Sequence, residues 1–423
     1  MNQLSYLEKL LDGVEVEWKP LDDVCDFKNG FAFKSNLFKE AGLPIIRITN
    51  IDGFNVILDN VKYFSPNDYK EDISSFEISI GDILIAMSGA TTGKVGIYKS
   101  EKKCYLNQRV GKFIPKDNIL NNKFLYHFLL LNTESIYILA GGGAQPNLSS
   151  NVLMSKLLIP IPCPNNPEKS LAIQSEIVRI LDKLTALTAE LTAELTARKK
   201  QYNYYRDQLL SFKEGEVEWK TLGDVTKKWY SGGTPTAGNP EYYVNGKIPW
   251  LRTQEVKFTD ISTTDVKITE AALKNSSAKW IPKNCVIIAI SGATAGRSAI
   301  NKIPLTTNQH CGCLEIDSKK ALYRYVFHWV SFNYESIKVL GQGARGDLNS
   351  TIIKNFKLPI PYATNPEKSL QEQAKIVAVL DKFDTLINSI SEGLPREIEL
   401  RQKQYEYYRD LLFNFPKPKS VTN

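Results

Sequence analysis

The chain contains almost every recognisable stretch twice. Three pairs show this most clearly: EVEWK at 15–19 and 216–220, NPEKSL at 166–171 and 365–370, and QYNYYRDQLLSF at 201–212 with QYEYYRDLLFNF at 404–415. The two copies keep the same order and lie about 200 residues apart. Solenoid repeats recur every 20 to 50 residues or so, so this spacing predicts a tandem duplication of one large unit.

Loop-like stretches inside each copy are also paired. They are PIIRITNI (44–51) with PWLRTQEV (249–256), SGATTGK (88–94) with SGATAGR (291–297), NQ at 107–108 and 308–309, and GGGAQPNLSS (141–150) with GQGARGDLNS (341–350). Polar residues at matched places in the two copies are therefore the first candidates for function.

Each copy begins with a globular module of about 140 residues and ends in a long helix. Strand-like runs at 81–87 and 284–290, separated by Gly-containing turns, predict an α/β module. Residues 166–212 open with Asn-Pro-Glu, which suits a helix start, and then place apolar residues three to four apart. About 45 helical residues would form a rod of roughly 70 Å.

The second helix differs from the first in its middle. Gly393-Leu394-Pro395 should break or kink it, because Pro disrupts the helical hydrogen-bond ladder. The first helix instead contains a repeated T-A-E-L word at 188–191 and 192–195 that has no counterpart in the second.

These patterns predict two globular α/β domains separated by two long antiparallel helices, in a pseudo-twofold tandem repeat. The expected boundaries are a helix remnant at 1–20, globular domains at 21–162 and 215–361, a central spacer helix at 163–214 and a C-terminal spacer helix at 362–423. Residues 6–19 resemble a shortened 205–220, which suggests that the N-terminus is the remnant of a preceding helix end.

Composition limits the classes of protein. The N-terminus carries charges inside its apolar stretch, unlike a signal peptide, and the six cysteines form no CxxC pair. We therefore expect a cytoplasmic protein with reduced thiols. Only three histidines occur, which argues against a His-based metal or catalytic cluster, and the net charge of +7 is compatible with a polyanionic ligand.

Motifs for chemistry are missing. SGATTGKV falls one residue short of a P-loop and lacks its hydroxyl, and GQGARG follows a helical pattern rather than a strand. The chain contains neither HExxH nor GxSxG, and it has no Asn-Pro-Pro-aromatic stretch of the kind expected in an adenine methyltransferase. The residues alone therefore predict a non-catalytic, two-headed binding protein.

Over almost its whole length the chain resembles the specificity subunit of a type I restriction-modification system. The residues that carry this resemblance are the C-terminal SISEGLPREIELRQKQYEYYRDLL (389–412), the NPEKSL helix starts with IVRILDKL (177–184) and IVAVLDKF (376–383), and the paired SGATxGK/R and GxGAxxxL loops.

The resemblance implies two domains that each read half of a bipartite site on double-stranded DNA. It also implies that the helices dock two methyltransferase subunits, which carry S-adenosylmethionine, and that restriction/translocase subunits using ATP and Mg join them. No cofactor is expected on this chain.

Specific DNA binding needs phosphate anchors and side chains that reach base edges. Arg and Asn or Gln in the paired loops are candidates, and so are Lys94 and Arg297 in Gly-rich loops that could hold a phosphate. The alternative is a structural role, as turn-formers or as carboxylate partners. The candidates are Arg47, Asn50, Lys94, Gln108, Arg109, Gln145, Arg252, Gln254, Arg297, Gln309 and Arg345.

The tyrosine-rich helix ends have helical spacing, which favours core packing or a partner interface over base stacking. The partner candidates are Tyr202, Tyr205, Arg206, Tyr405, Tyr408 and Arg409. Leu187, Leu191 and Leu195 recur every four residues through the T-A-E-L words. One such word lengthens a helix by about 6 Å, so the repeat suggests a ruler for the gap between half-sites, although a replication slip in a tolerant helix would leave the same pattern.

Two other functions remain open at this point. A stand-alone DNA-modifying enzyme is disfavoured by the missing catalytic motifs. A coiled-coil adaptor for protein or RNA would explain the helices but not two diverged heads.

Overall fold

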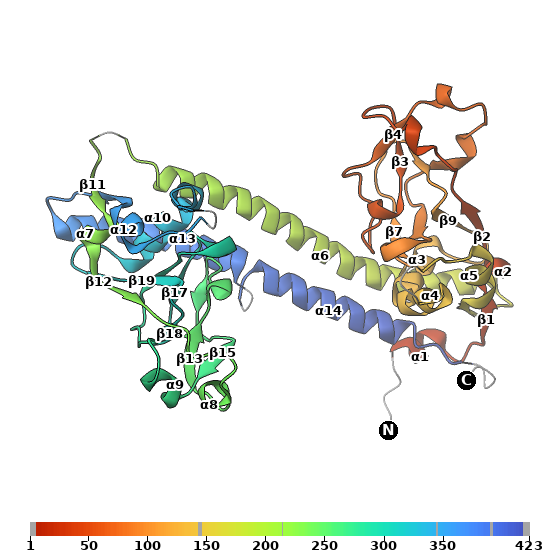
Figure 1. Ribbon diagram of the computed structural model, residues 1–423. Helices are drawn as coiled ribbons and strands as arrows, with labels where there is room; N and C mark the ends of the chain where they lie inside the picture. The colour runs from red at the N-terminus through yellow and green to blue at the C-terminus, as the bar shows by residue number, and fades with distance from the viewer. Residues whose placement is uncertain (1–5, 143–145, 214, 344–345, 390–391, 418–423) are drawn as a thin grey trace. The chain divides into compact units, whose positions relative to one another are not determined.

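The computed structural model describes residues 6–142, 146–213, 215–343, 346–389 and 392–417. The chain divides into two compact units (Figure 1). Unit 1 comprises Met1–Leu191 with Glu397–Asn423, and unit 2 comprises Thr192–Arg396. Each unit therefore combines one module with parts of helices that belong to both copies of the duplication.

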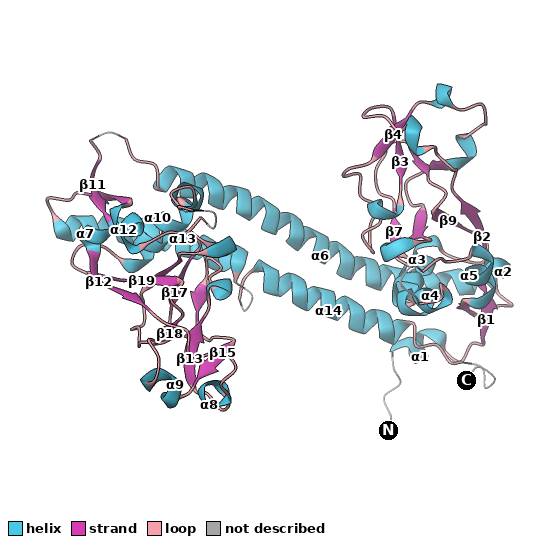
Figure 2. Cartoon of the chain, in the orientation of Figure 1, coloured by secondary structure: helices cyan, strands magenta, loops and turns pink. Residues whose placement is uncertain are grey.

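Unit 1 contains two four-stranded sheets and a two-stranded ribbon (Figure 2). The first sheet has the order β2-β9-β6-β7, the second the order β4-β3-β8-β5, and the ribbon pairs β1 with β10. Its strands are β1 Val16–Pro20, β2 Cys25–Asn29, β3 Leu43–Ile46, β4 Lys62–Phe64, β5 Glu77–Ile78, β6 Ile83–Ala86, β7 Val95–Ile97, β8 Cys104–Leu106, β9 Val110–Pro115 and β10 Leu158–Pro162.

Helices pack against these sheets and bury a large apolar cluster. Helix α3 contributes Phe124, Leu125, Phe128 and Leu129 to this cluster, and all four are almost fully buried. The α-helices are α1 Tyr6–Leu11, α2 Leu21–Val24, α3 Asn122–Leu131, α4 Thr133–Leu139, α5 Ser150–Lys156, α6 Pro167–Leu209 and α14 Leu394–Leu412, and the short 3-10 turns are η1 Ser35–Leu37, η2 Ile48–Asn50, η3 Pro66–Asp68, η4 Ser74–Phe76 and η5 Gly89–Thr91.

Unit 2 repeats the design with small changes. Its sheets have the orders β12-β19-β16-β17-β14 and β15-β13-β18, and β11 pairs with β20. The strands are β11 Val217–Thr221, β12 Thr226–Ser231, β13 Ile248–Leu251, β14 Asp260–Ile261, β15 Val266–Ile268, β16 Val286–Ala289, β17 Ser298–Asn301, β18 Thr306–Thr307, β19 Cys311–Ile316 and β20 Lys357–Pro361. The helices are α7 Leu222–Val225, α8 Pro240–Tyr243, α9 Glu270–Lys274, α10 Tyr323–Phe332, α11 Tyr334–Lys338, α12 Ser350–Asn355 and α13 Pro366–Asn388, with 3-10 turns η6 Thr253–Glu255 and η7 Gly292–Thr294.

The predicted long helices form, and the second is interrupted as expected. Helix α6 is continuous over 43 residues and includes both T-A-E-L words, which consist of good helix formers apart from Thr. The second stretch is two helices, since α13 ends at Asn388 and α14 begins at Leu394. Gly393 lies between them, where an added Cβ would come within 2.4 Å of the Thr385 carbonyl oxygen.

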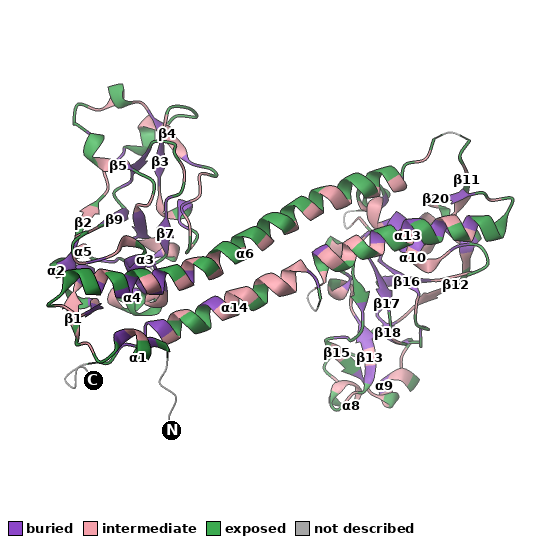
Figure 3. Ribbon diagram, turned by 180° about the vertical axis from the view of Figure 1, so that it is seen from behind, coloured by how far each residue is buried: buried purple, intermediate pink, exposed green. Residues whose placement is uncertain are grey.

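Most of α6 is not buried in either core. Its buried residues all lie between Ser170 and Leu181 (Figure 3). Further along, Leu187 is 38% exposed, and Leu191 and Leu195 are half-buried. The fully buried packing of α6 is therefore concentrated near its start.

The end of each long helix is built into the core of the module from the other copy. In unit 1, Tyr405, Leu412, Phe413 and Phe415 join the core, and the Phe413 ring lies 4.9 Å from that of Phe124. In unit 2, Leu210 of the α6 end joins the equivalent core, with half-buried Tyr202, Leu209 and Phe212 packed against it.

In unit 1 the end of α14 runs opposite to α6, and in unit 2 the end of α6 lies beside α13. In unit 1, Tyr405 lies level with Asp182 in the middle of α6, because both contact His127. Further along, Trp18 Nε1 donates to the Pro416 carbonyl at 2.8 Å, and Trp18 lies in the ribbon that leads into α6. In unit 2, Tyr205 stacks on Phe383 of α13, with ring centroids 5.6 Å apart.

The N-terminal helix α1 packs beside this junction in unit 1. Leu7 and Leu11 are buried in the core, and the Tyr6 hydroxyl donates to Glu176 at 2.9 Å. The residues that match the α6 end are supplied by α14, so α1 is an additional element here. Its origin as a helix remnant stays a prediction.

The buried His127 side chain links three helices of unit 1. The His127 ring on α3 places Nε2 3.1 Å from the Asp182 carboxylate and Nδ1 2.9 Å from the Tyr405 hydroxyl. Burial lowers the pKa of His127 and outweighs the attraction of Asp182, so the ring is neutral at pH 7. The neutral ring can donate its Nε2 proton to Asp182 and accept the Tyr405 hydroxyl proton at Nδ1, so both ring nitrogens have a partner.

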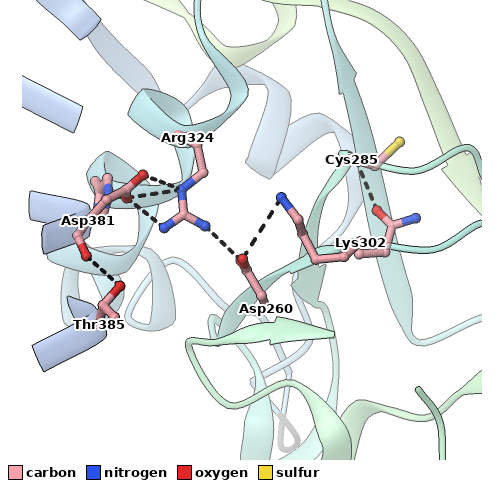
Figure 4. A network of polar contacts seen from close by, with 8 residues as sticks. Asp260, Cys285, Lys302, Arg324, Asp381 and Thr385 are labelled. Carbon is pink, nitrogen blue, oxygen red and sulfur yellow. Dashed lines mark hydrogen bonds and ion pairs between the residues drawn. The ribbon is translucent and has the colours of Figure 1, made fainter. Parts of the chain in front are cut away.

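Unit 2 repeats the histidine–aspartate contact and has Arg324 where unit 1 has Lys123, whose Nζ lies 2.6 Å from Asp182 (Figure 4). Arg324 on α10 donates from Nε and Nη2 to Asp381 on α13, with a shortest distance of 2.5 Å, and from Nη1 to Asp260 at 2.7 Å. His328 Nε2 lies 2.6 Å from the same Asp381 carboxylate. In both units one aspartate on the long helix thus binds the matched histidine of the module, together with Lys123 in unit 1 and Arg324 in unit 2.

Candidate nucleic-acid interface

Three of the paired loops meet at the carboxyl end of β6 in unit 1. Met87 follows that strand, and its N–H donates to the Arg109 carbonyl at 2.9 Å while its carbonyl accepts from Leu148 N–H at 2.7 Å. The Thr91 hydroxyl also donates to the Ile48 carbonyl, at 3.3 Å. Segments 47–50, 88–94, 107–109 and 146–148 therefore form one continuous surface.

Unit 2 gathers the matching segments around β16. Ile290 follows the strand, donates its N–H to the His310 carbonyl at 2.9 Å and accepts from Leu348 N–H at 2.8 Å. The same backbone arrangement thus occurs twice, with different side chains on it. Such a scaffold suits two heads that present different polar groups to different ligand sequences.

Several predicted contact residues are free to reach a ligand. Lys94, Gln108, Arg109, Gln254 and Gln309 are exposed, and Arg297 is half-buried. The side chains of Lys94, Gln108, Arg109 and Arg297 make no hydrogen bond or ion pair with any other residue in the described ranges. Cations and amides left exposed in this way on converging loops can bind phosphate and base edges.

Asn50 and Arg252 have structural contacts instead. Asn50 is 1% exposed, accepts from Arg47 N–H at 3.0 Å and donates to the Asp59 carbonyl at 3.1 Å. Arg252 lies 3.6 Å from the carboxylates of both Glu255 and Asp265. These contacts support the turn-forming and ion-pairing interpretations of the two residues.

Arg47 differs from Arg252 because its partner is neutral. Its Nη2 donates to the Asn60 carbonyl at 3.4 Å, and its Nε is buried without a hydrogen bond among the described residues. Arg252 Nε is buried and unbonded in the same way. Gln145 and Arg345 lie outside the described residues.

A further loop beside the site was missed from the sequence. Residues 29–34 in unit 1 and 231–235 in unit 2 press against the Asn-Gln turns. A Cβ added to Gly30 would lie 2.1 Å from the Asn107 carbonyl oxygen, and one added to Gly232 would lie 1.8 Å from that of Thr307. Matched glycines at these two positions are the signal that could have revealed this contact.

The predicted partner residues divide between core and surface. Tyr405 is only 1% exposed and belongs to the core of unit 1, and Tyr202 is half-buried in unit 2. Tyr205 and Tyr408 are 40% and 38% exposed. The half-buried Arg206 and Arg409 each pair with the aspartate that follows them. The most exposed tyrosines of the two motifs are Tyr204 at 62% and Tyr407 at 65%.

The described residues contain no group of three or more His, Cys, Asp or Glu side chains arranged to hold a metal ion. Within the same described residues, no helix has the length and apolar character needed to cross a membrane.

Comparison with known proteins shows the family of the chain. Residues 13–198 and 214–400 each match the family described as the type I restriction modification DNA specificity domain. The chain is 44% identical to the Escherichia coli type I restriction enzyme EcoR124I/EcoR124II specificity subunit, covering 100% of both chains. It is 35% identical to a putative type I restriction enzyme specificity subunit of Haemophilus influenzae, covering 98% of this chain and 99% of that one.

A solved structure supports the fold. The type I restriction-modification S subunit from M. genitalium matches with a TM-score of 0.61 at 18% identity, covering 98% of this chain and 100% of that one.

Proposed function

The chain belongs to the type I restriction-modification DNA specificity family, and from this premise we propose that its two units read the two halves of one bipartite site on double-stranded DNA. The convergent loops carry the proposal, because the same backbone scaffold presents different polar side chains in the two units. A two-part site follows if each scaffold reads its own sequence.

We further propose that this chain supplies recognition and that partner subunits supply chemistry. Two methyltransferase subunits would bring S-adenosylmethionine, and restriction/translocase subunits would bring ATP and Mg. The exposed tyrosine pairs Tyr204–Tyr205 and Tyr407–Tyr408 support a matched pair of docking faces, because exposed aromatic residues are enriched at protein interfaces. The proposed setting is the cytoplasm, where these partners and DNA meet.

Lys94 and Arg297 test the DNA-binding role. Lys94→Ala and Arg297→Ala should each weaken binding to cognate and unrelated duplexes alike, and each should lower the slope of log K against log salt by about 1, as expected for one lost phosphate contact. The assay is a salt titration of duplex binding by the chain co-purified with the methyltransferase subunit encoded beside it.

Lys375→Ala is the matched control, because Lys375 is 74% exposed on α13, away from the loops. It should leave both the affinity and the slope unchanged. Equal binding of duplex DNA and single-stranded RNA by the wild-type complex would contradict the proposal and favour an adaptor.

Deletion of residues 192–195 tests the spacer hypothesis. The deletion removes one T-A-E-L word from within the continuous α6, so it should shorten the helix by about 6 Å without breaking it. At about 3.4 Å per base pair, the unspecified gap in the recognised DNA should shorten by one or two base pairs. Sequencing of methylated sites measures the gap. An unchanged gap would indicate that the repeat is only a replication slip that the helix tolerates.

A further inference from the structure

The Asn308-Gln309-His310 turn in unit 2 is held in one conformation from three sides. Asn308 is 9% exposed, and its Oδ1 accepts from His310 N–H at 3.1 Å, which closes the turn. The Ser231 hydroxyl donates to the Gln309 carbonyl at 3.4 Å. Ser291 Oγ lies 2.6 Å from His310 Nδ1. The backbone and both neighbours of the exposed Gln309 side chain are therefore fixed.

Thr234 also fixes the Gln309 side chain. Its hydroxyl donates to Gln309 Oε1 at 2.6 Å, a length typical of an O–H···O bond and short for an N–H···O bond. The amide oxygen therefore faces Thr234, and the Nε2 group with its two hydrogens faces away from it. Both residues are exposed, so the amide nitrogen is presented at the surface.

Unit 1 has no such hydroxyl. Counting from the matched Gly30 and Gly232, the position of Thr234 is occupied by Ala32. There the Gln108 N–H donates to the Phe31 carbonyl at 2.8 Å, but its side chain bonds no other residue in the described part of the chain. Ser88, the counterpart of Ser291, has a buried hydroxyl without a hydrogen bond among these residues. The contacts that orient the Asn-Gln turn through Thr234 and Ser291 are therefore found in unit 2 and not at the matched positions of unit 1.

We propose that Thr234 is a positioning residue that makes Gln309 a donor-only reader of guanine in the half-site of unit 2. A Gln that reads adenine uses its oxygen to accept from N6 and its nitrogen to donate to N7. With Oε1 turned to Thr234, Gln309 offers two N–H donors, which match the adjacent N7 and O6 acceptors of guanine. The pre-oriented amide also loses less rotamer freedom on binding.

This inference rests on the proposed DNA-reading function, and the experiment separates the two. The wild-type chain is co-expressed with its methyltransferase subunit, the methylated motif is mapped, and methylation rates are measured on duplexes with each specified G·C pair changed to A·T. A wild-type complex that methylates no split motif would contradict the proposed function itself.

The variants then test Thr234. Gln309→Ala should relax one G·C pair in one half-site. Thr234→Val keeps the shape but removes the hydroxyl, so Gln309 Oε1 becomes free to accept from adenine N6. Thr234→Val should therefore lower the preference for G·C over A·T at that same pair by roughly tenfold, with the other half-site unchanged.

Two controls sharpen the result. Thr234→Ser retains the donor and should keep wild-type discrimination, and Ser88→Ala in unit 1 should alter neither half-site. The inference is overturned if Gln309→Ala relaxes no pair, if the relaxed pair is not G·C, or if Thr234→Val retains full discrimination at the pair that Gln309→Ala relaxes.

Discussion

Phe413→Ala is expected to destabilise unit 1 by about 3 to 5 kcal/mol, although residue 413 lies far along the sequence from the module whose core it joins. Its ring packs on Phe124, Phe128 and Phe415, and it is only 5% exposed. Removing it leaves a cavity among these aromatic rings. Hydrogen exchange read by mass spectrometry locates the loss, because peptides from α3 and β9 should exchange faster.

Leu210→Ala is the matched change in unit 2, since Leu210 aligns with Phe413 and is 1% exposed. It should lower the free energy of unfolding of unit 2 by about 2 to 5 kcal/mol and accelerate hydrogen exchange in α10 rather than in α3. Two results for Phe413→Ala would count against this account: unchanged exchange in unit 1, or accelerated exchange in unit 2. Either result would contradict the packing of each helix end in the core of the module from the other copy.

Asp381→Ala is expected to lower the free energy of unfolding of unit 2 by about 2 to 3 kcal/mol at pH 7, because it removes the acceptor of both Arg324 and His328 and leaves Asp260 as a partner of Arg324 alone. Thermal unfolding of the variant checks the size. Asp384→Asn, one turn later on α13, is the control. Burial, together with nearby Asp381, raises the pKa of Asp384, so a neutral amide there should maintain or increase stability.

The effect of Asp381→Ala should depend on pH. Burial alone would raise the pKa of Asp381, but hydrogen bonds from His328 and Arg324 outweigh it and hold that pKa below its usual value. A carboxylate with a depressed pKa stabilises the folded state above its unfolded pKa of about 4 and loses that contribution as the pH falls through the folded pKa. The difference between wild type and variant should therefore shrink below about pH 4, and a difference that grows on acidification would contradict the ion pair.

The duplication explains why so much of the fold could be predicted from the sequence. Two copies of each motif revealed two modules that each end in a long helix, and the Gly393-Leu394-Pro395 stretch, which has no counterpart in the first copy, predicted the break in the second helix. Helical spacing also assigned Tyr405 to a helix end, but periodicity does not say which surface that end meets. Its burial against His127 depends on contacts across 278 residues, which no local pattern encodes.

The candidate site was only partly predictable for a similar reason. Paired loops identified Lys94, Gln309 and their neighbours, because exposed polar residues in matched glycine loops stand out. Asn50 belongs to the same class of residue, yet it is a buried turn-former. The contact between Thr234 and Gln309 could not be predicted from the sequence, because it joins residues 75 positions apart and has no counterpart in the first copy.

A methylation map should reveal whether one chain reads two separate DNA sequences with two equivalent scaffolds. The chain is co-expressed with the methyltransferase subunit encoded beside it, in a host that lacks adenine methylation, and modified adenines are located by sequencing. We expect a split motif with a fixed unspecified gap, which is absent when this chain is left out. A single continuous motif, or the same methylation without this chain, would contradict it.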